Sequence, residues 1–193
     1  MLTKARMRGI VGGAAILTLF GGLWCIVALI FWRERPQWAI PVASAATFVL
    51  LALCILRLAA SARMPDGHDP AAAAKGKRAG ILFGIVFGIE GGLIALSSVL
   101  LARAGAGDWI PVVTGLIVGV HFLPLAYVLE MPLYYWTGAL SVFGVLACLF
   151  IHAVGVRLLC VGLVMAGVLW LTVLLLLVQM RSAHGARTGD ANI

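Results

Sequence analysis

The fold is decided by residues 79–129, which read AGILFGIVFGIEGGLIALSSVLLARAGAGDWIPVVTGLIVGVHFLPLAYVL. Two apolar runs, 79–102 and 109–129, flank the short polar turn 103–108. Each run has about 20 residues or more, enough to cross a hydrocarbon core of ~30 Å as a helix. Backbone polar groups in lipid must pair within their own segment, so both runs are predicted to be helices of one antiparallel hairpin.

The same pattern continues on both sides of this hairpin, with further apolar runs at 9–32, 38–60, 133–153 and 156–180. The 193-residue chain is 63% hydrophobic and only 11% charged, whereas a globular domain carries roughly 25% charged residues. The sequence therefore predicts an all-α integral membrane bundle of six transmembrane helices. They form one transmembrane domain, 1–193, with hairpins 9–60, 79–129 and 133–180. Residues 61–78 are predicted to be a cytoplasmic linker and 181–193 a disordered cytoplasmic tail.

Lysine and arginine residues gather on one side of the predicted bundle. With the N-terminus in the cytoplasm, ten of them face inward and four face outward. Cytoplasmic segments of membrane proteins carry the excess of Lys and Arg, so both termini are predicted to be cytoplasmic. The inner set is Lys4, Arg6, Arg8, Arg57, Arg63, Lys75, Lys77, Arg78, Arg181 and Arg187, and the outer set is Arg33, Arg35, Arg103 and Arg157.

Several function classes lack their signatures in this chain. The net charge of +7 comes from residues at the ends of apolar runs, without the basic and aromatic stripe of a nucleic-acid-binding protein. Neither a P-loop, a GxSxG elbow, an HExxH motif nor a dinucleotide fingerprint occurs. The four cysteines lie inside apolar runs without metal-ligand spacing, and only Cys148 and Cys160 flank one turn closely enough for a disulfide to remain an alternative. No metal and no cofactor is predicted.

The first two hairpins look like copies of one another. Gly21-Gly22-Leu23 recurs as Gly91-Gly92-Leu93, and Ile40-Pro41-Val42 recurs as Ile110-Pro111-Val112. A chance match is the alternative, because small residues are common in membrane helices. The layout of three tandem hairpins resembles the bacterial acid-resistance membrane proteins built from duplicated hairpins. The HFLPLA stretch, residues 121–126, also resembles a segment of small uncharacterised bacterial six-helix proteins. These resemblances imply a multi-pass protein of the bacterial inner (plasma) membrane and carry over no activity.

Two ionisable residues stand near the centres of apolar runs, Glu90 and His121. Each lies 15.5 residues from the centre of the turn between Gly105 and Ala106, which is ~23 Å along its helix. Adjacent antiparallel helices are therefore predicted to bring the two side chains together at one depth in the membrane. In the repeat, Glu90 takes the place of Phe20, so the pair belongs to one copy alone.

The same arithmetic pairs Ser97 with Thr114 one level further out, because each lies 8.5 residues from the turn centre. Seven residues are nearly two helical turns, so Ser97 shares a face with Glu90, and Thr114 with His121. Glycines at every fourth position are predicted to let helices pack closely. A proline is predicted to kink the fourth helix. These residues are Gly84, Gly88, Gly92, Gly115, Gly119 and Pro124.

Three functional hypotheses follow from this pattern. The favoured one is proton-linked transport or small-solute binding at a midplane site of Glu90, His121, Ser97 and Thr114, because ionisable residues inside membranes mark ion and substrate pathways. The alternative is a structural or regulatory protein, an accessory subunit or stress-response component, in which the pair ties two helices together. An intramembrane enzyme is least favoured, since no third catalytic group lies at that depth. The predicted partners are the lipid bilayer and a small solute or proton; assembly into a homo-oligomer or a larger membrane complex stays open.

Overall fold

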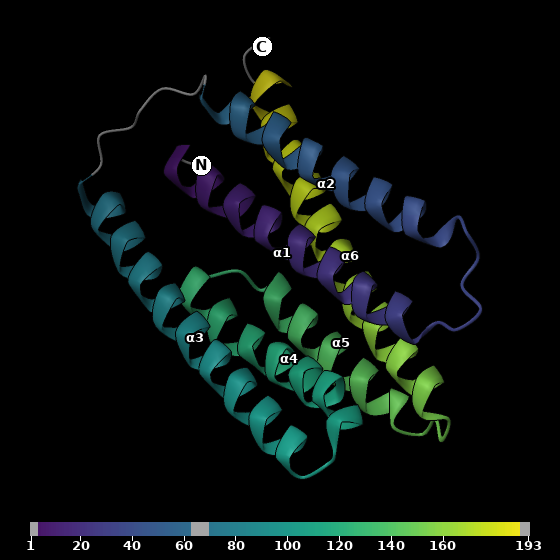
Figure 1. Ribbon diagram of the computed structural model, residues 1–193. Coiled ribbons are helices and arrows are strands. Elements are labelled where there is room, and N and C mark those ends of the chain that lie inside the picture. The colour runs from purple at the N-terminus through teal and green to yellow at the C-terminus, as the bar shows by residue number, and fades with distance from the viewer. Residues whose placement is uncertain (1–3, 63–69, 190–193) are drawn as a thin grey trace.

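The computed structural model describes residues 4–62 and 70–189, and all regular structure in these ranges is helical (Figure 1). Within these described ranges, five helices are long and apolar enough to cross a membrane, and a sixth apolar helix, α5, is shorter. The chain is thus an all-α bundle of the kind that multi-pass membrane proteins form. The elements are α1 (Lys4–Phe31), α2 (Ala39–Ala62), α3 (Pro70–Arg103), the 3-10 turn η1 (Gly107–Trp109), α4 (Ile110–Leu129), α5 (Leu133–Cys148) and α6 (Val154–Gly189).

Three boundaries differ from those predicted. Of the linker expected at 61–78, residues 61–62 and 70–78 are helical, because α2 runs to Ala62 and α3 begins at Pro70, while residues 63–69 lie outside the described part of the chain. Proline is favoured in a first helical turn, and the alanines that follow are strong helix formers. Likewise α6 continues to Gly189, where a disordered tail was expected from Arg181. Helix α5 ends at Cys148 instead of Ala153, and the chain turns with Ile151 donating to the Cys148 carbonyl.

The helices pack in the order α2, α1, α6, α5, α4, α3 (Figure 1). Helices α1 and α6 form the most extensive contact, whereas α2 and α3 each pack mainly against their own hairpin partner and lie at the two edges. The core runs along α6, where Val161, Met165 and Leu169 are buried. At the edges, large apolar side chains such as Phe48 and Ile89 stay exposed. A continuous apolar exterior of this extent suits lipid and not water.

Hydrogen bonds between the described helices include two in the core. The hydroxyl groups of Thr137 on α5 and Thr172 on α6 lie 2.8 Å apart. The indole Nε1 of Trp170 on α6 donates to the Thr18 carbonyl of α1 at 3.2 Å. All four cysteines are free thiols, so the alternative of a disulfide between Cys148 and Cys160 is wrong. The bundle is therefore held by packing and a few polar contacts.

The predicted packing glycines divide between two helices. On α4 a Cβ at Gly119 would lie 2.7 Å from a Val142 methyl group, and one at Gly115 would lie 3.0 Å from Val145. Only glycine lets α4 and α5 approach so closely. On α3 the expectation does not hold: Gly84, Gly88 and Gly92 are exposed, and an added Cβ would meet nothing within 4 Å. These three glycines lie on a face of α3 that no other described helix covers.

Candidate functional site: a cavity lined by Glu90, His121 and aromatic rings

Glu90 and His121 meet where α3 packs against α4. The apolar span of α3 runs over Gly76–Arg103 and places Glu90 at its middle. The His121 Nδ1 atom lies 3.3 Å from the Glu90 Oε2 atom, and the two side chains are only 8% and 10% exposed. The short turn between the two helices fixes their register, so this contact agrees with the depth predicted from the sequence.

The imidazole of His121 keeps unused hydrogen-bonding capacity. Although Nδ1 lies close to the Glu90 carboxylate, it has no aligned hydrogen-bond partner within residues 4–62 and 70–189. Leaving a buried polar atom unpaired costs about 1–3 kcal/mol. Such an atom therefore favours a water molecule or a ligand that supplies the missing partner.

A cavity of about 50 Å³ adjoins the pair. A buried water molecule needs at least roughly 10–15 Å³ of such space, so the cavity has room for a few. Its remaining walls come from α1, α4, α5 and α6 and are almost wholly apolar. The aliphatic part of the wall consists of Ile16, Leu17, Val118, Leu125, Leu129 and Leu169. The carboxylate and the imidazole thus stand as polar groups in a largely apolar cavity, as in many small-molecule sites.

Aromatic rings from four helices line the same cavity. Phe87 on α3 stacks on Phe83 at 5.9 Å and meets Phe20 of α1 edge-to-face at 6.2 Å. The chain of rings continues through His121, whose centroid lies 6.5 Å from Phe87 and 5.7 Å from Phe122. Phe122 in turn lies 5.7 Å from the ring of Tyr134 on α5. We call Phe20, Phe83, Phe87, Phe122 and Tyr134 the aromatic cluster.

Sequence reasoning missed the aromatic cluster. One local signal was present, since Phe83, Phe87 and Glu90 follow at i, i+4 and i+7 and so share a helix face. The contribution of Phe20 was hidden, because it depends on how α1 packs against α3. The Phe20 ring lies beside Phe87 and lines the same cavity as Glu90, the residue that occupies the corresponding position in the second hairpin.

The other predicted site residues stay outside the cavity. Ser97 Oγ donates to the Ile94 carbonyl at 3.1 Å, and within the described part of the chain no hydrogen bond joins it to Thr114. A serine hydroxyl in a helix commonly satisfies itself on the preceding turn in this way. Thr114 is half-buried without lining the cavity. Pro124 lies inside α4, and it is exposed and does not line the cavity.

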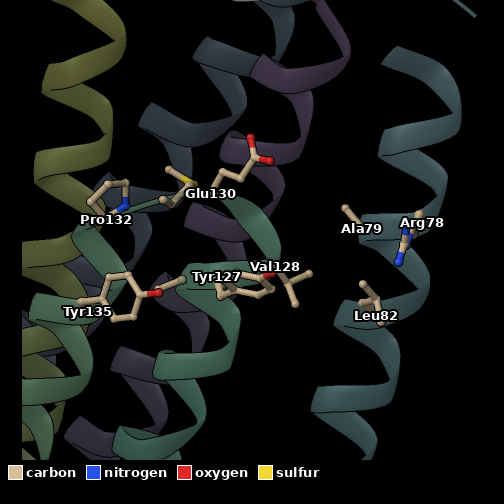
Figure 2. Close-up of a pocket in the computed structure, with 10 residues that line it drawn as sticks. Arg78, Ala79, Leu82, Tyr127, Val128, Glu130, Pro132 and Tyr135 are labelled. Carbon is tan, nitrogen blue, oxygen red and sulfur yellow. The ribbon is translucent and has the colours of Figure 1, made fainter. Parts of the chain in front are cut away.

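A second, open hollow of about 570 Å³ lies at the end of the same seam. Figure 2 shows Arg78, Ala79 and Leu82 on α3 across from Tyr127 and Val128 on α4. The two hollows are neighbours along α3, because Leu82 lines this one and Phe83 lines the cavity beside Glu90. The open hollow carries the charged side chains of Arg78 and Glu130 and faces the turn between α4 and α5.

Metal binding is not suggested by the donor groups present. Among the residues that the structure describes, no group of three His, Cys, Asp or Glu side chains gathers in a way that could hold a metal ion. Comparison of the chain with models of protein families, with curated proteins and with solved structures finds no match.

Proposed function

We propose that the protein is a proton-linked carrier of a small solute, in which Glu90 and His121 form the site that takes up and releases the proton. The observation that carries the proposal is the 3.3 Å contact of a carboxylate and an imidazole beside a cavity in the middle of the bundle. Placing an ionisable side chain at the bilayer centre costs at least ~2.5 kcal/mol. Such residues are rare in membrane spans and mark ion and substrate pathways.

Two further features support a working site over a passive contact. The Nδ1 atom of His121 has no aligned partner among the described residues, and the adjoining cavity has room for water. Imidazole and carboxylate groups are the usual members of intramembrane proton relays. A pair kept only for packing would be expected to satisfy both groups and to leave no space beside them.

The orientation proposed from the charges indicates which end of the bundle faces the cytoplasm. With both termini in the cytoplasm of a bacterial cell, and the bundle in its inner membrane, Arg78 lies at the cytoplasmic side. The open hollow lined by Arg78, Tyr127 and Glu130 then forms the cytoplasmic entrance next to the central cavity. This arrangement fits the midplane location of substrate sites in small transporters.

A structural role is the second candidate, and one observation favours it. Helix α3 packs almost only against α4, so the Glu90–His121 contact joins α3 to the rest of the bundle. A polar contact between membrane helices contributes ~0.6 to ~2 kcal/mol to their association. In this alternative the pair holds an accessory subunit together and exchanges no proton under physiological conditions.

Infrared titration distinguishes the two candidates. Purified protein in lipid is taken from roughly pH 5 to pH 9, the range in which a physiological relay must change charge, while the C=O stretch of protonated carboxylic acids is followed. We expect one carboxyl band that disappears with rising pH in the wild type and is missing in Glu90→Gln. Ser97→Ala, a change on the same helix outside the cavity, should keep the band. Wild-type protein without a titrating band assigned to Glu90 would contradict the carrier proposal.

A further inference from the structure

The aromatic cluster and Glu90 define a binding chemistry more specific than a proton site. Phe83 and Phe87 lie on the same face of α3 as Glu90, and Phe20 of α1 meets Phe87 at 6.2 Å. The face of an aromatic ring attracts cations, and groups of such rings recognise quaternary ammonium ligands. A single carboxylate beside several rings is therefore suited to an organic cation.

The charges around the cavity support the same chemistry. The ionisable side chains that line it are Glu90 on α3, His121 on α4 and Tyr134 on α5, and the lining residues of α1 and α6 are uncharged. With a neutral imidazole and an ionised Glu90, the cavity carries one negative charge. A monocation or a proton neutralises that charge, so the two compete for the same carboxylate.

The apolar lining of the cavity indicates that the cationic ligand is also hydrophobic. Apart from Glu90, His121 and the Tyr134 hydroxyl, the cavity is lined by aliphatic and aromatic side chains and glycine. A hydrophilic cation would lose its hydration there without replacement, which is costly. A cation that bears apolar substituents loses little hydration free energy on entering the cavity, because its substituents prefer the apolar wall to water.

The packing of α3 indicates how such a molecule enters. Helices α1 and α3 both line the cavity, yet they touch each other at few points, among them the Phe20 and Phe87 rings. Apart from Glu90, the residues of α3 between Gly76 and Arg103 are exposed or half-buried. The seam between α1 and α3 is therefore lightly packed, and the Phe20 and Phe87 rings are among the few side chains that meet across it.

We infer that the solute is a hydrophobic organic monocation, such as a quaternary ammonium or phosphonium ion, which reaches the cavity from the bilayer between α1 and α3 and exchanges there with the proton of Glu90. This inference rests on the proposed carrier function and names its substrate class. One O–H bond breaks and another forms: the proton of the Glu90 carboxyl passes to a water molecule, and the cation pairs with the carboxylate that remains. The cavity of about 50 Å³ holds water only, so the seam opens when the larger cation binds.

Tetraphenylphosphonium is a suitable probe, because it is a permanent monocation with four apolar rings. Its binding to the purified protein in lipid nanodiscs is measured by equilibrium dialysis, with empty nanodiscs subtracted. We expect binding that weakens as the pH falls and the release of up to one proton per bound cation in weakly buffered solution. Both readouts use the wild type, so they do not depend on whether a variant folds.

Variants then locate the site. Glu90→Gln should weaken binding at least tenfold and abolish proton release, whereas Phe87→Ala should weaken binding about 2-fold to 30-fold, the range of cation–π contributions. Phe143→Ala is the matched control, since Phe143 is an exposed phenylalanine of α5 outside the cavity. An uncharged tetraphenyl compound of the same shape should bind the protein at least tenfold more weakly than the cation.

The outcomes separate this inference from the carrier proposal. If the carboxyl of Glu90 titrates but the cation does not bind, or binds without releasing a proton, the substrate class is wrong and the proton site stands. The same conclusion follows if the uncharged compound binds equally well. If Glu90 does not titrate at all, both proposals fail.

Discussion

Replacing Glu90 by Gln and His121 by Asn, singly and together, measures the free energy that couples the two side chains. At the observed 3.3 Å, two unit charges would attract by about 5 kcal/mol at an effective dielectric constant of ~20. Desolvation of two side chains that are only 8% and 10% exposed offsets most of this attraction. Polar contacts between membrane helices leave ~0.6 to ~2 kcal/mol. We therefore expect a coupling free energy of about 1–2 kcal/mol, stabilising the folded state.

The assay is reversible unfolding of the four proteins in mixed micelles, from which the coupling is the non-additive part of the stability changes. The same cycle built on Ser97 and Thr114 serves as a control, because Ser97 donates to its own helix. That control should give less than about 0.5 kcal/mol, the error of additivity for independent sites. A coupling below this value for Glu90 and His121 would refute the contact and the site built on it.

Two further predictions concern packing and orientation. Gly119→Leu should destabilise the bundle by about 1–3 kcal/mol in the same unfolding assay, because its Cβ would lie 2.7 Å from Val142. Gly84→Leu is the control and should change stability by less than about 0.5 kcal/mol, because no described residue covers Gly84. Equal effects of the two substitutions would contradict the packing of α4 on α5. Cysteines introduced at Lys77 and Asp108 should react with membrane-impermeant reagents from opposite sides of the membrane, Lys77→Cys from the cytoplasm and Asp108→Cys from outside; the reverse labelling would show that the orientation is inverted.

The Glu90–His121 contact was accessible from the sequence because a short turn connects its two helices. Helix rise per residue is nearly constant, so equal distances from the turn place two residues at equal depth. The same reasoning brought Ser97 level with Thr114 but could not show that the Ser97 hydroxyl donates to Ile94. Depth follows from counting residues, whereas the choice of hydrogen-bond partner depends on local geometry.

Features that depend on packing between distant segments were not predictable in this way. The glycine pattern is similar on α3 and α4, yet Gly119 lies against Val142 while Gly88 faces no neighbour. Which helix lies at the edge of the bundle is decided by all pairwise contacts together. The aromatic cluster was missed for the same reason, since Phe20 and Phe87 are far apart in the sequence and meet only through the packing of α1 beside α3.

The helix ends show a further limit of hydropathy. Apolar runs report the part of a helix that lipid surrounds, but α3 and α6 continue beyond those runs into polar sequence. Alanine-rich segments such as residues 71–74 form helix without any apolar face. Conversely, α5 stops at Cys148 although apolar residues follow it. Span length and helix length are therefore separate properties of this chain.

An experimental density map of the protein in a lipid bilayer, at a resolution that shows ordered water, would reveal whether Glu90 and His121 form a hydrated site. We expect the Glu90 carboxylate and the His121 imidazole to face each other, with density for water or a bound solute in the adjoining cavity and within hydrogen-bonding distance of Nδ1. A tightly packed seam without such density, or side chains directed into separate helix interfaces, would contradict this expectation.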